Sequence, residues 1–228
     1  MEKLSNKIKK VKQSIIAVGF KPNPNKVTII GSGFCVQKKG VIMSAAHLYK
    51  QVPNEYKSKI CGMAMTKQEP NGLEHYKWSM LELKNKDDVN DVALFEYKDP
   101  EDTLLAPLSL GDSDKIEAGE DAYFIGFPYA AQLINEGMGI TLVVNKTIVS
   151  NIKRDGTDPS LKRNFIILDA ISNPGNSGSP LIDLKTNKVV GVMVISWRVM
   201  SKTIPNLDIR EPMHICAAKP INLASSLL

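Results

Sequence analysis

Short runs of β-branched and aliphatic residues recur along the whole chain, and glycine, proline, asparagine or aspartate residues bound almost every run. Such runs are typical of β-strands, because branched side chains pack well on a pleated surface and the bounding residues favour turns. The expected strands of a first group span residues 14–20, 27–36, 40–46, 59–66, 77–84 and 92–97. Those of a second group span residues 120–127, 139–151, 164–171, 180–184, 188–197 and 213–219. The sequence therefore predicts an all-β protein.

Two groups of about six strands predict two six-stranded antiparallel β-barrels. We expect a basic N-terminal tail over residues 1–13, an N-terminal barrel over 14–110 and a C-terminal barrel over 111–228. Only residues 220–228 have a clearly helical pattern, and they predict a short C-terminal helix. Functional residues from the two halves would then meet only in the cleft between the barrels.

The balance of charge excludes some classes of partner. The 228-residue chain carries a formal net charge of +5, but its basic residues are dispersed apart from several lysines near the N-terminus. It contains no basic stripe with interleaved aromatic residues, so we expect no nucleic-acid partner. No apolar run approaches the roughly 20 residues that span a bilayer, so we expect no membrane partner either.

The three cysteines of the chain, Cys35, Cys61 and Cys216, are few and far apart. This spacing implies no disulfide framework, and each cysteine is expected to be a small buried apolar residue. The N-terminal lysines precede only a short apolar stretch without the cleavage site of a signal peptide. A cytoplasmic location is the expectation that follows.

Residues 175–180 read GNSGSP and place Ser177 on a tight turn that glycines flank. A serine hydroxyl becomes an effective nucleophile when a general base, an orienting acid and an oxyanion site surround it. The segment SAAH offers His47 as the base, and the segment DVALF offers Asp91 as the acid at the start of an apolar strand. The backbone N–H groups of Gly175 and Ser177 would be free to bind an oxyanion.

Each of these residues also has a purely structural interpretation. His47 could be a packed core histidine, Asp91 could cap a strand, and GNSGSP could be an ordinary turn. The structural interpretations explain each motif separately. They do not explain why all three motifs occur in one chain in this order.

The order His47, Asp91, Ser177 resembles the trypsin/chymotrypsin superfamily of serine peptidases, and further motifs resemble its HtrA-like (Deg) branch. These motifs are IGSGFCV (30–36), LGDSDKIEAGEDAYFIGFP (110–128), DAISNPGNSGSPL (169–181) and HICAAKPI (214–221). The resemblance implies a chymotrypsin-like fold with a His47–Asp91–Ser177 triad in the cleft between the barrels. Many members of that branch carry a peptide-binding PDZ domain, and we expect this chain to lack one.

The resemblance also implies which residues line the primary specificity pocket. They are Ile171, Ser172, Ser196, Trp197, Arg198 and His214. Ile171 at the base would suit an aliphatic substrate side chain. Arg198 stands where the family usually has glycine, and it could pair with a substrate carboxylate, narrow the pocket or face solvent. The sequence leaves the choice between an aliphatic and an acidic substrate side chain open.

These observations predict a serine endopeptidase that hydrolyses peptide bonds in proteins through an acyl-enzyme, without a metal or cofactor. Its expected partners are protein or peptide substrates, and the sequence does not indicate an oligomeric state. The alternative hypothesis keeps the fold but makes the cleft a catalytically silent or partner-gated binding module. An activating protein partner would then order the loops around residues 129–139 and 153–162.

Overall fold

The computed structural model describes residues 2–153, 164–200 and 210–228. The strands of the first half are β1 (Ile15–Asn23), β2 (Lys26–Cys35), β3 (Val41–Ser44), β4 (Ile60–Gln68), β5 (Glu74–Asp87) and β6 (Val92–Tyr97). Those of the second half are β7 (Asp121–Gly126), β8 (Val143–Lys153), β9 (Phe165–Leu168), β10 (Pro180–Asp183), β11 (Val189–Met200) and β12 (Arg210–Pro220). The helices are α1 (Leu4–Val11), α2 (Ala46–Gln51) and α3 (Ala130–Asn135), with 3₁₀ helices η1 (Lys12–Ser14), η2 (Asn54–Lys59) and η3 (Ile221–Leu227).

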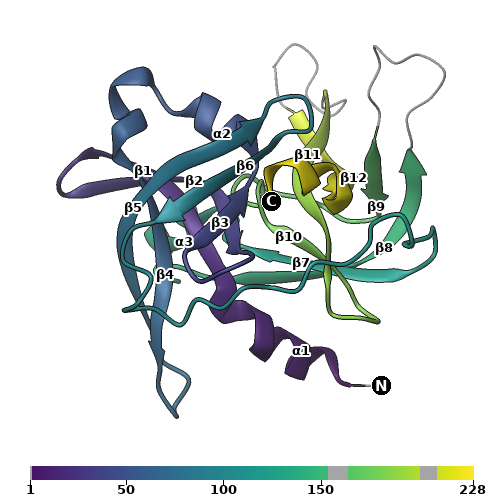
Figure 1. The fold of residues 1–228 in the computed structure, drawn as a ribbon, viewed down its shortest axis with the longest axis horizontal. Helices are drawn as coiled ribbons and strands as arrows, with labels where there is room; N and C mark the ends of the chain where they lie inside the picture. Colours follow the sequence, from purple (N-terminus) through teal and green to yellow (C-terminus); the bar gives the residue numbers. More distant parts are fainter. Residues whose placement is uncertain (1, 154–163, 201–209) are drawn as a thin grey trace.

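The strands form two closed barrels that lie side by side (Figure 1). The first has the strand order β1-β2-β3-β6-β5-β4, and it closes because β1 pairs with β4 as well as with β2. The second has the order β10-β11-β12-β9-β8-β7, and it closes through the pairing of β10 with β7. All of these strand pairs are antiparallel, so the predicted pair of six-stranded barrels is confirmed.

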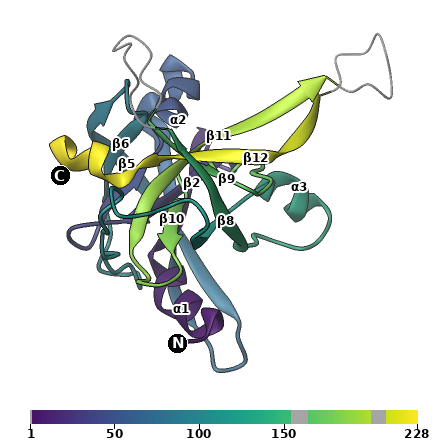
Figure 2. The ribbon, with the colours of Figure 1, turned by 90° about the vertical axis from the view of Figure 1, so that its right-hand side faces the viewer.

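Two hairpins extend beyond the apolar runs that predicted them. Strand β5 begins at Glu74 and ends at Asp87, whereas the apolar pattern covers only residues 77–84. Strand β11 continues to Met200, where it pairs with Arg210 of β12, and the two strands project from the second barrel as an arm (Figure 2). A projecting strand end packs against no core, so it needs no apolar alternation, and the sequence pattern misses it.

The expectation that only the C-terminal residues are helical is wrong. Most of the expected tail at residues 1–13 forms α1. Leu4, Ile8 and Val11 repeat at the spacing that places them on one helix face, and they pack against apolar residues from both barrels. The lysines between them hid this amphipathic pattern.

The other helical segments are short. Helices α2 and α3 contain six residues each, too few to leave a periodic pattern in the sequence. The C-terminal segment is helical as expected, in the form of the 3₁₀ helix η3. None of the described helices is long and apolar enough to cross a membrane. Of the two loops expected to respond to a partner, residues 129–139 contain α3, whereas all but the first residue of 153–162 lie outside the described part.

Buried apolar side chains form three clusters. One contains residues of the first half of the chain only, and another contains residues of the second half only. The third joins the barrels, because Phe34 and Met43 from the first lie in the same cluster as Phe127 and Val192 from the second. Burying a large apolar side chain contributes roughly 1.5–3 kcal/mol, so this third cluster holds the two barrels in one relative position.

Helix α1 is anchored by a buried lysine. The side chain of Lys7 is only 4% exposed, and its ammonium group donates hydrogen bonds to the carbonyl oxygens of Leu184 and Lys185, at 2.6 and 3.2 Å. These carbonyls belong to the turn between β10 and β11, which lies beside α1 (Figure 1). The N-terminal segment therefore connects β1 of the first barrel to a turn of the second.

Replacing this lysine should destabilise the protein. The Lys7→Ala variant is expected to lower the free energy of unfolding by about 1.5–3 kcal/mol, because it removes charge-assisted hydrogen bonds from two carbonyl groups. Lys9→Ala removes an exposed lysine of the same helix and should change that free energy by less than about 0.5 kcal/mol. Urea unfolding of both variants measures the difference, and equal stabilities would show that Lys7 does not anchor α1.

The cysteines should be unreactive in the folded protein. All three are buried and free, as expected, and burial raises the pKa of Cys61 to about 11 and that of Cys216 to about 12. Burial also raises the pKa of Cys35. Since the thiolate is the reactive form, a thiol reagent at pH 8 should label no cysteine in the native state and all three in denaturant. Fast labelling of the native protein would contradict this burial.

Candidate active site

His47 is the second residue of α2, a helix that begins without a side-chain cap of its own. The first backbone N–H groups of a helix need acceptors from elsewhere, and Asp91 supplies them. Its carbonyl oxygen accepts from Ala46 N at 3.2 Å, and its Oδ1 accepts from His47 N at 2.7 Å. Its Oδ2 lies 2.7 Å from Nδ1 of the His47 ring. One aspartate thus fixes both the backbone and the ring of this histidine.

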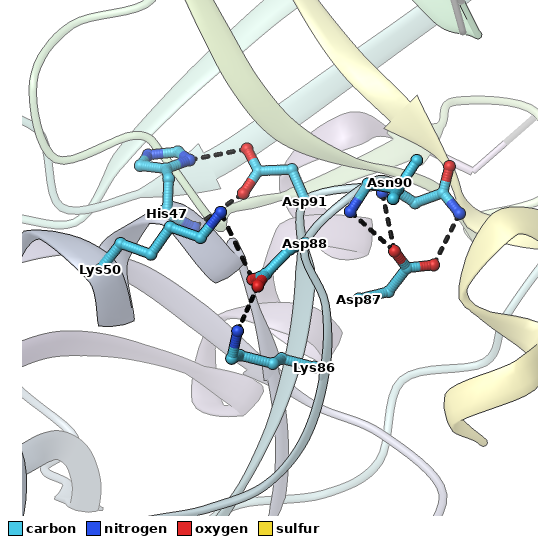
Figure 3. A network of polar contacts seen from close by, with 8 residues as sticks. His47, Lys50, Lys86, Asp87, Asp88, Asn90 and Asp91 are labelled. Atoms are coloured by element: carbon cyan, nitrogen blue, oxygen red, sulfur yellow. Dashed lines mark hydrogen bonds and ion pairs between the residues drawn. The ribbon is translucent and has the colours of Figure 1, made fainter. Parts of the chain in front are cut away.

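Asp91 is held by a tight turn between β5 and β6 (Figure 3). The carboxylate of Asp87 accepts hydrogen bonds from the backbone N–H groups of Val89 and Asn90, at 2.8 and 2.9 Å. The side-chain amide of Asn90 donates to the same carboxylate at 2.7 Å. Asp91 itself has a φ of +54°, a left-handed conformation that aspartate adopts more readily than most residues. The turn thereby directs the Asp91 carboxylate toward His47.

Other charged groups near this pair form surface contacts. Asp88 pairs with Lys50 at 3.5 Å and also with Lys86 (Figure 3). The hydrogen bond from Lys86 holds the pKa of Asp88 below its usual value. Exposed ion pairs of this kind contribute little to stability. The described residues contain no group of three or more histidine, cysteine, aspartate or glutamate side chains that could hold a metal ion.

Ser177 lies on the segment between β9 and β10, where glycines shape the turn. Gly175 has a φ of +101° and Gly178 has a φ of +84°. Residues that carry a Cβ atom rarely adopt these backbone conformations. Space is restricted as well. A Cβ on Gly175 would lie 2.3 Å from the carbonyl oxygen of Phe127, and one on Gly178 would lie 2.1 Å from that of Ser32. Both glycines are therefore required for the turn to lie this close to its neighbours.

Ser32 of β2 links this turn to the first barrel. Its backbone N–H donates to the carbonyl oxygen of Ser177 at 2.8 Å, and its hydroxyl donates to that of Gly175 at 2.7 Å. The same hydroxyl accepts from Phe127 N at 2.9 Å, and the Ser32 carbonyl accepts from the hydroxyl of Ser44 at 2.6 Å. All the polar groups of this fully buried serine are used. The sequence alone did not predict this role for Ser32.

The turn that carries Ser177 and the start of α2 are in contact. A Cβ on Gly178 would lie 2.3 Å from Ser44 Oγ and 3.1 Å from Ala45 N, and these residues lead directly into α2. Ser177 and His47 thus lie on adjacent segments of opposite barrels. Within the described residues, no hydrogen bond joins the His47 ring to Ser177 Oγ. Catalytic hydrogen bonds are often long in the absence of substrate.

The backbone N–H groups of the turn alternate between bonded and free. Those of Asn176, Gly178 and Ser179 donate to carbonyl oxygens of the protein, at 2.9, 2.7 and 3.0 Å. Among the described residues, those of Gly175 and Ser177 have no such acceptor. These are the two groups that the sequence predicts to bind an oxyanion. The lack of a protein acceptor is consistent with that role, since an oxyanion site needs N–H donors that do not already donate to another group.

Asn176 is buried beside the proposed nucleophile. Its side chain is fully inaccessible, and neither its Oδ1 nor its Nδ2 has a partner among the described residues. Burying an unpaired amide costs far less than burying an unpaired carboxylate. This difference accounts for an uncharged residue at this position.

The structure brings part of the predicted specificity pocket together. Ser196 Oγ donates to the carbonyl oxygen of Ser172 at 2.5 Å, which joins β11 to the segment before the nucleophile. Ser172 is buried, and the neighbouring Ile171 is partly buried. These three residues lie on adjacent segments, and their contact with a substrate stays a prediction.

The remaining pocket residues lie at the base of the arm. Strands β11 and β12 lose register here: Ser196 pairs with Cys216, whereas Arg198 pairs with Pro212. Residues 213–215 therefore bulge opposite Trp197, and His214 is exposed within the bulge. Arg198 is exposed too, which agrees with the alternative that its side chain faces solvent.

Comparison with known proteins supports the resemblance seen in the sequence. Residues 31–192 match the family model described as the trypsin-like peptidase domain. The serine protease HTRA1 of Xenopus laevis is 31% identical over 187 residues, which cover 80% of this chain and 35% of the relative. The serine protease HTRA3 of Mus musculus is 30% identical over 165 residues, which cover 71% of this chain and 32% of the relative. The chain thus spans about a third of the length of these curated relatives.

Two solved structures show the same fold. The HtrA-type protease AlgW, solved with a tripeptide, superposes with a TM-score of 0.65 at 21% identity, covering 99% of this chain and 62% of the other. Deg5 superposes with a TM-score of 0.67 at 21% identity, covering 99% of this chain and 94% of the other. Together with the family match over residues 31–192, these likenesses establish that the chain belongs to the trypsin-like peptidase family and contains an HtrA-like protease domain.

Proposed function

We propose that the protein is a serine endopeptidase whose nucleophile is Ser177. The observation that carries the proposal is the double contact of the Asp91 carboxylate with the backbone and the ring of His47, beside the glycine turn that holds Ser177. Bonded in this way, the Nδ1 atom keeps its proton, and Nε2 is left as the base.

The proposed reaction proceeds in two stages. Ser177 Oγ attacks the carbonyl carbon of the scissile bond while its proton passes to Nε2 of His47. The free N–H groups of Gly175 and Ser177 stabilise the oxyanion, and His47 then protonates the leaving amine. Water attacks the resulting acyl-enzyme, with His47 again acting as the base. Asp91 orients the imidazole and stabilises its charged form throughout.

The substrates proposed are proteins or peptides. The pocket that the resemblance implies contains Ile171, which is partly buried and would suit an aliphatic side chain on the acyl side. Arg198 is exposed, and its guanidinium could still pair with a substrate carboxylate, so an acidic preference stays the second possibility.

One observation favours a gated form of the same enzyme. Among the described residues, the His47 ring makes no hydrogen bond with Ser177 Oγ, so the two side chains would have to come closer, either when a substrate binds or when an activating protein partner binds. A gated enzyme would cleave peptides slowly when alone and faster with the partner.

Removing the nucleophile tests the function directly. The Ser177→Ala variant should lose activity toward a diverse peptide library, with kcat reduced by as much as about 10⁶-fold. Ser58→Ala, which alters an exposed serine of η2, should keep the wild-type activity. Cleavage is read by mass spectrometry of the products. Full hydrolysis by a folded Ser177→Ala preparation would exclude the proposed mechanism.

The role of Asp91 can be separated from a general effect of charge. Asp91→Asn should lower kcat by about 10³–10⁴-fold, because an amide no longer holds His47 in the required tautomer. Asp88→Asn removes a carboxylate from the same turn that contacts only lysines, and it should leave kcat within about twofold of the wild type. Steady-state kinetics on a cleaved peptide make the comparison. Similar kcat values for the two variants would rule out the orienting role of Asp91.

A further inference from the structure

A pocket of about 460 Å³ lies in the first barrel, between helix α2, the 3₁₀ helix η2 and strand β5. Its lining includes Tyr49 of α2, Lys57 of η2, four consecutive residues of β5 (80–83) and Lys98, which directly follows β6. None of the residues to which a catalytic role or a place in the specificity pocket has been given lines it. The pocket is therefore a separate surface of the molecule.

The apolar part of the lining continues the core of the first barrel. Leu81 is only 4% exposed and belongs to the buried cluster that contains residues of the first half of the chain only. Tyr49 and Leu83 are partly buried and pack against that cluster. A cavity of about 150 Å³ is large enough for benzene, so this pocket has room for an aromatic side chain. Such a side chain would extend the core and leave water.

One positive charge at the pocket has no acidic partner. The ammonium group of Lys57 lies 5.0 Å from the centroid of the Tyr49 ring. Within the part of the chain that the structure describes, Lys57 forms no ion pair. The other charges of the lining are matched, because Glu82 pairs with Lys98. The pocket thus combines an apolar surface with one uncompensated cation, which complements an apolar side chain beside a carboxylate.

The backbone of β5 is also open at this place. Strand β5 pairs with β4 only as far as Met80, opposite Cys61, and it pairs with β6 from Leu81 onward. Along residues 81–87, the edge of β5 that faces away from β6 has no neighbouring strand among the described residues. An extended peptide can add to such an edge through main-chain hydrogen bonds. This edge favours a peptide segment over a small anion as the ligand.

The pocket and the candidate active site lie on different sides of α2. His47 and Tyr49 are two residues apart in this helix, so their side chains point about 200° away from each other. The ring of His47 contacts Asp91, whereas Tyr49 lines the pocket. A segment bound here would therefore leave the active site free for another part of the same chain.

We propose that this pocket is a docking site for an acidic segment of protein substrates, in which a large apolar residue is flanked by carboxylates. The apolar side chain fills the pocket, a neighbouring carboxylate pairs with Lys57, and the segment lies along the open edge of β5. The role in substrate capture rests on the peptidase function proposed above. The binding itself does not, so it can be measured on a protein without the nucleophile.

The first experiment measures binding by fluorescence anisotropy, with the full-length Ser177→Ala protein and labelled Gly-Asp-Asp-Phe-Asp-Asp-Gly-amide. Two matched peptides replace either the phenylalanine by glycine or the four aspartates by asparagines. Each change should weaken binding on the order of tenfold, because it removes the burial of an aromatic ring or the charge-assisted contact. Equal affinities for the three peptides, or no binding of the first, would overturn the proposal.

A matched pair of lysine variants locates the binding site. Lys57→Gln, made in the Ser177→Ala protein, should weaken binding of the acidic peptide about tenfold. Lys59→Gln makes the same change of charge on η2, but Lys59 is exposed and does not line the pocket. It should change the affinity by less than about twofold. The same loss in both variants would assign the binding to the general positive field and contradict the proposal.

The second experiment uses the wild-type protein and two protein substrates that differ only in a terminal tag. One tag is the acidic peptide, and the other is its asparagine form. The acidic tag should lower KM about tenfold and leave kcat unchanged, because docking raises the local concentration of the substrate. The free acidic peptide should not alter hydrolysis of a small peptide ester. Inhibition of the ester reaction would place the peptide in the catalytic cleft, acceleration would indicate an activator site, and either result would refute docking of substrates.

The two proposals fail in different ways. If the wild type cleaves neither ester nor protein but the peptide binds through Lys57, the peptidase function fails and the peptide-binding site stands without its role in substrate capture. If the wild type cleaves both and the acidic peptide does not bind, the function stands and the docking site is refuted.

Discussion

The contact between the two barrels at Ser32 is the constraint on which the site depends. Each barrel closes on its own strands, so neither one alone fixes where the other places its functional residues. The apolar cluster shared by the two barrels stabilises their association, but the hydrophobic effect does not favour one orientation of the contacting groups over another. Ser32 makes directional contacts, because its N–H and hydroxyl groups donate hydrogen bonds to the carbonyl oxygens of Ser177 and Gly175 on the opposite barrel. The turn that carries Ser177, the proposed nucleophile, is thereby positioned from the barrel that carries His47, the proposed base.

Asp91 combines a structural task with its proposed chemical task in one residue. Helix α2 begins with N–H groups that no residue of its own caps, and Asp91 satisfies them through its carbonyl and one carboxylate oxygen. The other oxygen is then already beside the ring of His47. The histidine is oriented because the helix that carries it is capped by the same residue. Asp91 thus caps helix α2 rather than a strand, and this capping is compatible with its proposed catalytic role.

Much of this architecture could be predicted from the sequence, and several of the failures involve contacts with distant residues. Strands that pack against a core leave alternating apolar runs, so all twelve were found close to their observed positions. Segments that are stabilised by distant residues were missed. In α1, the buried Lys7 donates a hydrogen bond to the carbonyl oxygen of Leu184, and α2 is capped by Asp91. The links made by Ser32 were missed for the same reason, since a serine between glycines resembles any small turn residue. The predicted contact between Asp91 and the ring of His47 is present, and the catalytic roles of the two residues stay a prediction.

Labelling with a fluorophosphonate tests the central claim most directly, because this reagent reacts only with a serine that a neighbouring base has activated. We predict a single adduct per chain in the intact mass spectrum, located on the peptide that contains Ser177. Labelling should be lost in the Asp91→Asn variant, since His47 is then no longer held as the base. An unmodified protein, or an adduct on a different serine, would contradict the account.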